Sequence, residues 1–237
     1  MKTLFNAANL RGHNQFSWLD SYHSFSFGHF HDPSKMNFGV LRVLNDDTVD
    51  HDSGFGAHPH ENMEIISIPM QGDLEHSDNM GNRGVIRFGD VQIMSAGTGI
   101  QHSEYNNSKT ELVKFFQIWV FPAEQGLHPT YDQKTFDPTF RVNRWQTLVD
   151  PEGAEGVKIH QNAWFSIAKM DANSALEYQL HGADQGVYAL VISGEGKIGE
   201  QTIGLRDALG IWETEGFSVE AVKESEVLLI EVPMGSG

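Results

Sequence analysis

Short apolar runs recur along this chain and are separated by residues that favour turns. The clearest runs cover residues 39–44, 64–70, 84–88, 91–94, 112–121, 188–194 and 227–232. Several follow one another at spacings of roughly 8–12 residues, which is typical of β-sandwiches and β-barrels. Pro69 lies inside one run and indicates a bulge or an edge position there. We therefore predict an all-β protein in which any helices are few and short.

The segment from residue 122 to about residue 156 has a different pattern. It is polar, shows weak periodicity and contains four of the eight prolines of the chain. It also carries the aromatic residues Tyr131, Phe136, Phe140 and Trp145, which argue against a disordered linker. We interpret residues 123–156 as an irregular connection between an N-terminal domain (1–122) and a C-terminal domain (157–237).

Two pairs of potential metal ligands lie in the N-terminal part of the chain. His58 and His60 form an H-x-H pair, and His102 and Glu104 form an H-x-E pair about forty residues later. Side chains at i and i+2 of a strand point to the same face, so two such strands could close three imidazoles and one carboxylate around one ion. This donor set suits a divalent transition metal, iron above all, and leaves positions open for substrate and oxygen. Glu64 lies an even number of positions after His58 and His60 and could face the same side. Geometry alone therefore does not decide whether Glu64 or Glu104 is the carboxylate ligand.

A weak internal repeat indicates that only one domain holds metal. In the first half of the chain, a predicted strand ends at Gly72 and a later turn ends at Asp90. In the second half, a similar strand ends at Gly194 and a similar turn ends at Asp207. When these turns are aligned, the four potential ligands stand opposite Leu180, Gly182, Val219 and Ala221. None of these four residues binds metal through its side chain. We expect one metal ion per chain, in the N-terminal domain.

Composition and charge narrow the range of functions. The chain has no cysteine, which excludes disulfides, thiolate nucleophiles and cysteine-based metal sites. Its 16 basic and 32 acidic side chains give a formal net charge of −16, a field that repels phosphate backbones and anionic lipids. No apolar run approaches the ~18 residues that span a bilayer, and the first residues have no signal-peptide core. We expect a cytoplasmic protein that binds neither nucleic acid directly nor membranes.

Several motif blocks, taken in order, resemble known sequences. The H-x-H pair, a glutamate, a Gly-Asp turn and a later histidine resemble the two motifs of the cupin superfamily. More closely, GFGAHPHENMEI, HSDNMGNRG, GDVQIMSAGTGIQHSEYN and residues 24–33 are similar to the pirin family, particularly bacterial pirin-like proteins with quercetin 2,3-dioxygenase activity. The resemblance is strongest over residues 12–122 and looser towards the C-terminus. It implies a bicupin, in which two β-barrel or jelly-roll domains pack together and the second is degenerate.

The resemblance also implies a site and an activity. It implies that His58, His60, His102 and Glu104 bind one divalent metal, usually iron, with Zn, Cu, Mn, Ni or Co as alternatives. It favours Glu104 over Glu64 as the carboxylate ligand, and we expect Glu64 to hold the N–H of a ligand imidazole. The implied reaction opens the heterocycle of quercetin-like flavonols with O2, with Glu104 as the base. Other pirins act as metal- or redox-sensing proteins through a protein partner, so a non-catalytic function is the alternative.

The other histidines and the N-terminal aromatic residues are interpreted as structural. His76 precedes a predicted hairpin loop at residues 79–82, and we do not expect it at the metal. Phe25, Phe27 and Phe30 are interpreted as core rather than as a substrate pocket. The histidines for which we expect surface or hydrogen-bonded positions are His13, His23, His29, His31, His51, His128, His160 and His181.

Overall fold

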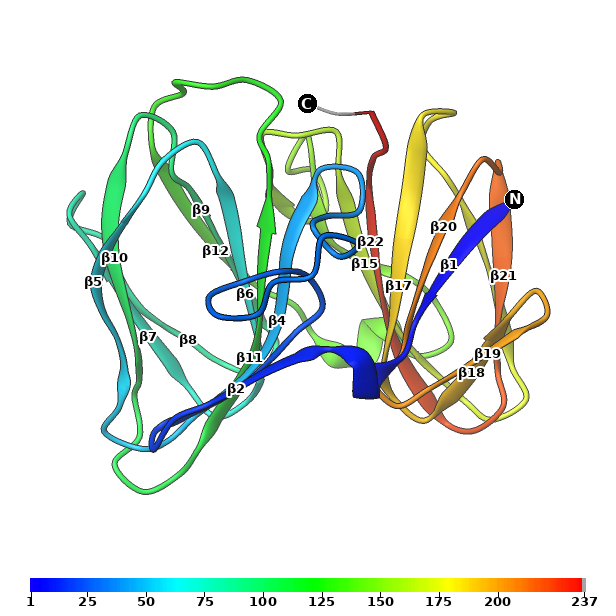
Figure 1. Cartoon of the computed structure of the whole chain (residues 1–237), viewed down its shortest axis with the longest axis horizontal. Coiled ribbons are helices and arrows are strands. Elements are labelled where there is room, and N and C mark those ends of the chain that lie inside the picture. Colours follow the sequence, from blue (N-terminus) through cyan, green and yellow to red (C-terminus); the bar gives the residue numbers. More distant parts are fainter. Residues whose placement is uncertain (236–237) are drawn as a thin grey trace.

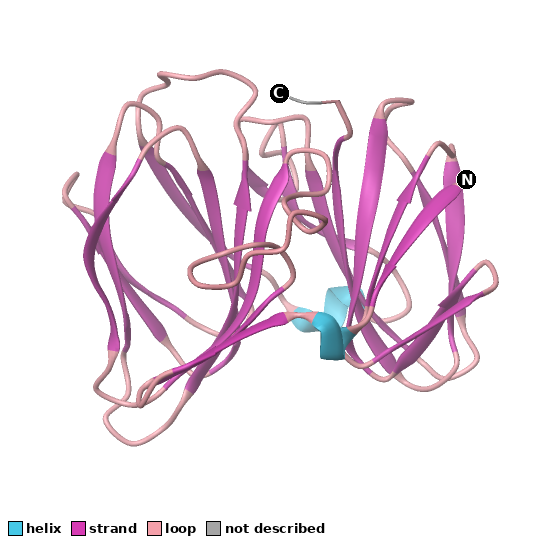
Figure 2. Cartoon of the chain, in the orientation of Figure 1, coloured by secondary structure: helices cyan, strands magenta, loops and turns pink. Residues whose placement is uncertain are grey.

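Two β-barrels pack side by side in the computed structural model, which describes residues 1–235 (Figure 1). Each barrel consists of one seven-stranded and one four-stranded sheet. Within the described residues, the helices are two short 3-10 turns, η1 (Ala8–Leu10) and η2 (Pro138–Arg141) (Figure 2). No helix in that range has the length and apolar character needed to cross a bilayer. The prediction of an all-β, two-barrel protein is confirmed.

The first barrel contains most of the N-terminal half of the chain. Its large sheet has the order β12 (Thr130–Thr135), β9 (Asp90–Ser95), β6 (Glu64–Gln71), β11 (Val113–Val120), β4 (Leu41–Val49), β3 (Leu19–His23) and β2 (Gly12–Gln15). Its small sheet has the order β5 (Gly54–His60), β10 (Ile100–Asn106), β7 (Leu74–Asp78) and β8 (Arg83–Ile86). The predicted hairpin loop at residues 79–82 joins β7 to β8.

The second barrel repeats this architecture. Its large sheet has the order β1 (Lys2–Asn6), β20 (Ala208–Trp212), β17 (Gln185–Ser193), β22 (Ser225–Pro233), β15 (Trp164–Met170), β13 (Gln146–Asp150) and β14 (Val157–Lys158). Its small sheet has the order β16 (Ala175–Gln179), β21 (Gly216–Ala221), β18 (Glu195–Ile198) and β19 (Gln201–Gly204). The β13–β14 pair is parallel.

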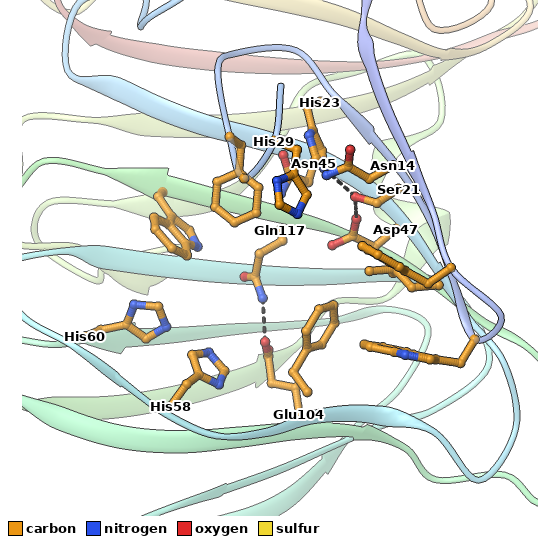
Figure 3. A pocket seen from close by; sticks show the side chains of 17 residues that line it. Asn14, Ser21, His23, His29, Asn45, Asp47, His58, His60, Glu104 and Gln117 are labelled. Carbon is orange, nitrogen blue, oxygen red and sulfur yellow. Dashed lines mark hydrogen bonds between the residues drawn. The ribbon is translucent and has the colours of Figure 1, made fainter. Parts of the chain in front are cut away.

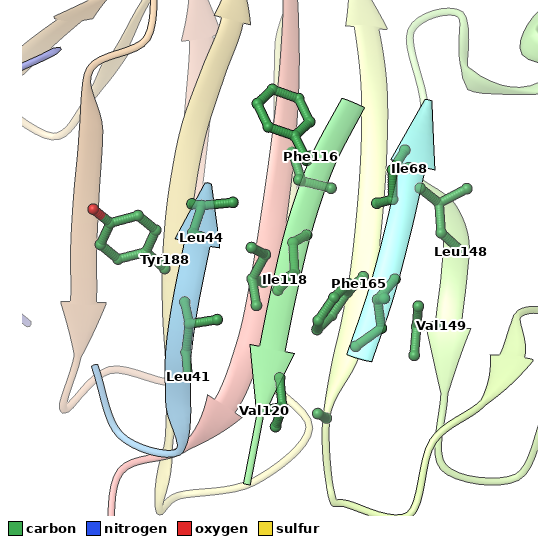
Figure 4. Close-up of a cluster of buried hydrophobic side chains, with 14 of the residues drawn as sticks. Leu41, Leu44, Ile68, Phe116, Ile118, Val120, Leu148, Val149, Phe165 and Tyr188 are labelled. Carbon is green, nitrogen blue, oxygen red and sulfur yellow. The ribbon is translucent and has the colours of Figure 1, made fainter. Parts of the chain in front are cut away.

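The large sheets of the two barrels face each other across one shared hydrophobic core (Figure 4). Strand β11 shows how the sequence produces this layer. Phe116, Ile118 and Val120 point towards the second barrel, whereas Phe115 and Gln117 point into the first. Because both faces of the strand are buried, its sequence is a nearly continuous apolar run rather than an alternating one.

The interiors of the two barrels differ in chemistry. The second barrel is filled by an apolar cluster that includes Val187, Leu209 and Leu229. The first barrel instead buries polar side chains such as Ser67 and Gln117 beside its apolar residues. Burying polar groups costs free energy unless they are paired, so a polar interior points to a binding function.

Strand β1 lies at the edge of the second barrel, although it comes first in the chain. It pairs with β20, from Lys2 opposite Trp212 to Asn6 opposite Ala208. The Ala8 N–H then donates to the Asp207 carboxylate as the chain leaves for the first barrel. Residues that we expected in the N-terminal domain therefore extend the second sheet. The side chains of β1 are largely exposed, so the pairing leaves no apolar pattern in the sequence.

The connecting segment, expected to be irregular, contains regular strands. Strand β12 pairs with β9 along its full length and completes the large sheet of the first barrel. Strand β13 pairs with β15 in the second barrel. Strand β12 is formed from polar sequence because it is an edge strand, which needs backbone hydrogen bonds more than two apolar faces. Strand β13 lies between β15 and β14 and contributes Leu148 and Val149 to the shared core. The prediction for Pro69 is confirmed, since the β6–β11 register shifts by one residue between Pro69 and Gln71.

Candidate metal centre

Three histidine side chains converge inside the first barrel. His58 and His60 lie on β5, and His102 lies directly opposite His58 on the paired strand β10. The ring centroids are 4.4 Å apart for His58–His102, 4.8 Å for His58–His60 and 4.9 Å for His60–His102. One nitrogen from each imidazole can be chosen so that all three lie within 4.8 Å of one another. The two i,i+2 pairs thus bring together the histidines that the sequence singles out.

A β-bulge in β5 helps to aim these rings. Gly56 and Ala57 together stand opposite Ser103, because the register shifts between the His102–His58 and Glu104–Phe55 pairs. The Gly56 carbonyl oxygen lies 2.7 Å from His58 Nδ1. A carbonyl can only accept, so Nδ1 carries the proton and Nε2 keeps a free lone pair. This arrangement is typical of a metal-binding histidine.

His102 and His60 are held in the neutral form that metal ions require. Burial lowers the pKa of His102 to about 2, and the neighbouring His58 and His60 act in the same direction. Burial also lowers the pKa of His60 to about 4. Neither imidazole nitrogen of His102 has a hydrogen-bond partner among the described residues. A buried ring with two unpaired nitrogens is costly, and a bound cation would compensate one of them.

Glu104 lies on β10 two residues after His102, and its carboxylate lines the same cavity. It accepts hydrogen bonds from Gln117 Nε2 at 2.6 Å and from Ser67 Oγ at 2.9 Å. Burial raises the pKa of Glu104 to about 7, although both hydrogen bonds oppose this shift. The carboxylate groups with His76 and His102, and it adjoins the three-histidine cluster through the shared His102.

His76 lies beside the histidine cluster, with its ring centroid 5.4 Å from that of His102, although we did not expect it there. It is fully buried on β7, directly opposite Glu104 on β10. Its Nε2 lies 3.3 Å from Asp78 Oδ2, and its ring packs 4.8 Å from Tyr131. The sequence could not show this position, because it does not reveal that β7 is the second neighbour of β10.

Glu64 points away from the barrel interior and into the layer between the two barrels. It accepts hydrogen bonds from Ser95 Oγ at 2.8 Å and from the His160 N–H at 3.1 Å. The expectation that Glu64 holds a ligand imidazole is wrong. Strand β5 ends at His60, and the chain turns at Asn62, with φ of 48°, before β6 begins. The alternation of one strand therefore does not continue into the next.

A cavity of about 290 Å³ opens in front of these side chains (Figure 3). His58, His60 and Glu104 form one wall, and polar side chains of β3 and β4 form the opposite wall. The aromatic residues that line the space between them include Trp18, Phe27, Phe55 and Trp119. Phe25 is buried in the core as expected, whereas Phe27 lines the cavity and packs edge-on against Trp119 at 5.3 Å.

The fold and the site together define a two-barrel cupin with a histidine cluster in one barrel. The chain belongs to the pirin family. The family model named Pirin matches residues 5–120, and a model described as the quercetinase C-terminal cupin domain matches residues 147–232.

Similar proteins are known from Escherichia coli. A quercetin 2,3-dioxygenase of strain K12 is 41% identical over 227 residues, which cover 95% of this chain and 96% of that protein. The crystal structure of YhhW superposes with a TM-score of 0.94 at 39% identity and covers 100% of both chains. A structure of the bacterial pirin YhhW in complex with nickel(II) has a TM-score of 0.93 at 38% identity, and covers 99% of this chain and 100% of that one.

Proposed function

We propose that this protein is a metal-dependent dioxygenase that uses O2 to open the heterocycle of quercetin-like flavonols. One observation carries the proposal: His58, His60 and Glu104 form one wall of a cavity whose other lining is rich in aromatic side chains, and His102 completes the histidine cluster beside them. The volume of about 290 Å³ suits one small flat ligand. The name of the 41% identical relative supports this choice of substrate class.

We propose His58, His60, His102 and Glu104 as the ligands of one divalent ion per chain. The residues fit such an ion because His58 Nε2 and both nitrogens of His102 are free of hydrogen bonds to other residues. Imidazole and carboxylate together suit iron, and we propose Fe(II). The nickel complex of the related YhhW supports a divalent site, and Zn, Cu, Mn and Co are the alternatives.

Glu104 is the residue that we assign to proton transfer. A bound metal would supply a Lewis-acidic centre for the flavonol 3-oxygen and a site of O2 reactivity. Glu104 then accepts the proton of the 3-hydroxyl, because its carboxylate lines the cavity beside the histidine cluster. Gln117 and Ser67 each bond one carboxylate oxygen and so fix its orientation.

Aerobic turnover tests the proposal directly. Iron-loaded protein is incubated with quercetin in air, and loss of flavonol absorbance, oxygen uptake and release of carbon monoxide are followed together. We expect all three to occur in equal amounts, and to stop when the metal is removed or His102 is replaced by alanine. Binding of quercetin without oxygen uptake by fully iron-loaded protein would contradict the proposal. The Asp20→Asn variant, on the outer face of β3, is the control and should match the wild type.

A further inference from the structure

The wall of the cavity that faces the histidine cluster is polar and has no assigned role. It is formed by Ser21 and His23 on β3 and by Asn45 and Asp47 on β4, which alternate inwards along their strands (Figure 3). All four are nearly inaccessible to solvent, at 1–3% exposure. We call these four residues the acceptor wall. The second barrel fills its interior mainly with an apolar cluster, although it also buries Ser166 and Glu231, so the fold itself does not require four polar residues here.

The hydrogen bonds inside the acceptor wall determine what it can bind. The Ser21 hydroxyl donates its one hydrogen to Asp47 Oδ1, and Ser21 Oγ also lies 2.8 Å from His23 Nε2. When Asp47 is ionised, His23 Nε2 carries a proton and donates to Ser21. Burial lowers the pKa of His23 to about 4, so the ring is neutral, in agreement with this arrangement.

Two acceptor atoms of the acceptor wall, Asn45 Oδ1 and Asp47 Oδ2, have no hydrogen-bond partner among residues 1–235. Asn45 Oδ1 is fully buried, and leaving a buried acceptor unpaired is costly. Burial also raises the pKa of Asp47 to about 7, which shows how poorly the site solvates this carboxylate. A ligand that donates hydrogen bonds would satisfy these acceptors, whereas the Asp47 carboxylate would repel an anion.

The rest of the cavity restricts the shape of that ligand. Trp18 packs edge-on against Phe55 at 5.2 Å, and Phe27 packs edge-on against Trp119 at 5.3 Å, so aromatic side chains border the path between the two walls. A flat aromatic molecule fits such a path. Its oxygen at one end would lie at the histidine cluster, and its other end would reach the acceptor wall.

We propose that the acceptor wall is a second recognition subsite, which binds the phenolic hydroxyl groups on the part of the substrate remote from the metal. Asp47 and Asn45 accept hydrogen bonds from these hydroxyls, and Ser21 holds Asp47 in position. The subsite selects polyhydroxylated arenes over arenes that carry only the metal-binding oxygen. This inference rests on the proposed function for the orientation of the ligand, but not for the existence of the subsite.

Equilibrium binding without turnover tests the subsite. Metal-loaded protein is titrated under anaerobic conditions with quercetin, which has hydroxyls on both outer rings, and with 3-hydroxyflavone, which lacks them. Quenching of tryptophan fluorescence reports binding, since Trp18 and Trp119 line the cavity. We expect wild-type protein to bind quercetin at least ~10-fold more tightly, the effect of about one buried hydrogen bond.

Two variants and one control decide the outcome. Asp47→Asn replaces one acceptor by a donor, and Asn45→Leu removes the amide at similar volume. Each should weaken quercetin binding ~10-fold and leave 3-hydroxyflavone binding unchanged. Asp20→Asn, whose side chain lies on the outer face of β3, should preserve the wild-type preference. A melting curve for each variant verifies that it folds. Because the two variants change different residues, each tests the subsite separately.

The possible results separate this inference from the proposed function. If both folded variants keep the wild-type preference for quercetin, the acceptor wall is not a subsite, even if the enzyme cleaves quercetin. If the preference depends on Asp47 and Asn45 but iron-loaded protein consumes no oxygen, the subsite stands and the dioxygenase proposal fails. An equal affinity of the wild type for both probes would also overturn the inference.

Discussion

At the scale of single residues, His102 is the side chain whose hydrogen-bonding needs most require a bound ion. It is buried and neutral, and neither of its nitrogens has a hydrogen-bond partner among residues 1–235. We expect His58→Ala, His60→Ala and His102→Ala each to abolish stoichiometric metal binding and to leave the circular dichroism spectrum nearly unchanged. The shared apolar core, rather than the ion, supplies most of the folding free energy. Global unfolding of the metal-free protein would show instead that the ion is structural.

The two buried glutamates provide a matched pair of substitutions. Glu104→Gln removes the charge beside the histidine cluster, and we expect it to weaken metal retention and to lower flavonol turnover by about 10²–10⁴-fold. Glu64→Gln removes the charge between the barrels, where the carboxylate accepts from Ser95 and His160. It should lower the unfolding free energy by about 1–3 kcal/mol and leave metal affinity intact. Full turnover by Glu104→Gln would exclude Glu104 as the base.

Asp47 should make the unfolding free energy depend on pH, and replacing this residue measures its contribution. Burial raises its pKa from 3.8 to about 7, so the folded state holds the proton more tightly than the unfolded state. Stability should therefore fall as pH rises through this window, by up to about 4 kcal/mol from this one group. Urea unfolding of wild type and Asp47→Asn between pH 4 and pH 7 measures the difference. An equal pH dependence in both proteins would contradict the assignment.

At the scale of elements, sequence patterns predict strands better than they predict which strands are neighbours. The H-x-H and H-x-E spacings place three histidines correctly, because alternation is a property of one strand. The same reasoning fails for Glu64, where a turn intervenes, and for His76, whose role depends on the β7–β10 pairing. The acceptor wall was also missed, since Ser21, His23 and Asp47 meet only after β3 and β4 have paired.

Strand β1 illustrates the same limit and can be tested by truncation. Removing residues 1–7 would expose the hydrogen-bonding edge of β20. We expect the unfolding free energy to fall by about 1–3 kcal/mol and the metal stoichiometry to stay the same, because the histidine cluster lies in the other barrel. Thermal melts and metal analysis measure both effects. Leu4→Ala, at a side chain that is 49% exposed, is the control and should change stability little.

At the scale of the whole molecule, the two barrels differ in what fills them. The positions that correspond to the ligands in the second barrel include Val219 and Ala221, which are buried in an apolar cluster. We expect one metal equivalent per chain by calorimetric titration and by metal analysis. Substituting His58 or His102 should reduce this value to near zero. A second equivalent that survives the loss of His102 would show that the second barrel also binds metal.

The placement of β1 also has a consequence for the order in which the protein assembles during translation. The first barrel has all its strands once β12, which ends at Thr135, has left the ribosome. Strand β1 is synthesised earlier than any of these, yet its partner β20 ends only at Trp212. Strand β1 therefore has no partner strand until β20 has been synthesised. An early strand of the chain thus pairs with a late one, and this pairing completes the large sheet of the second barrel.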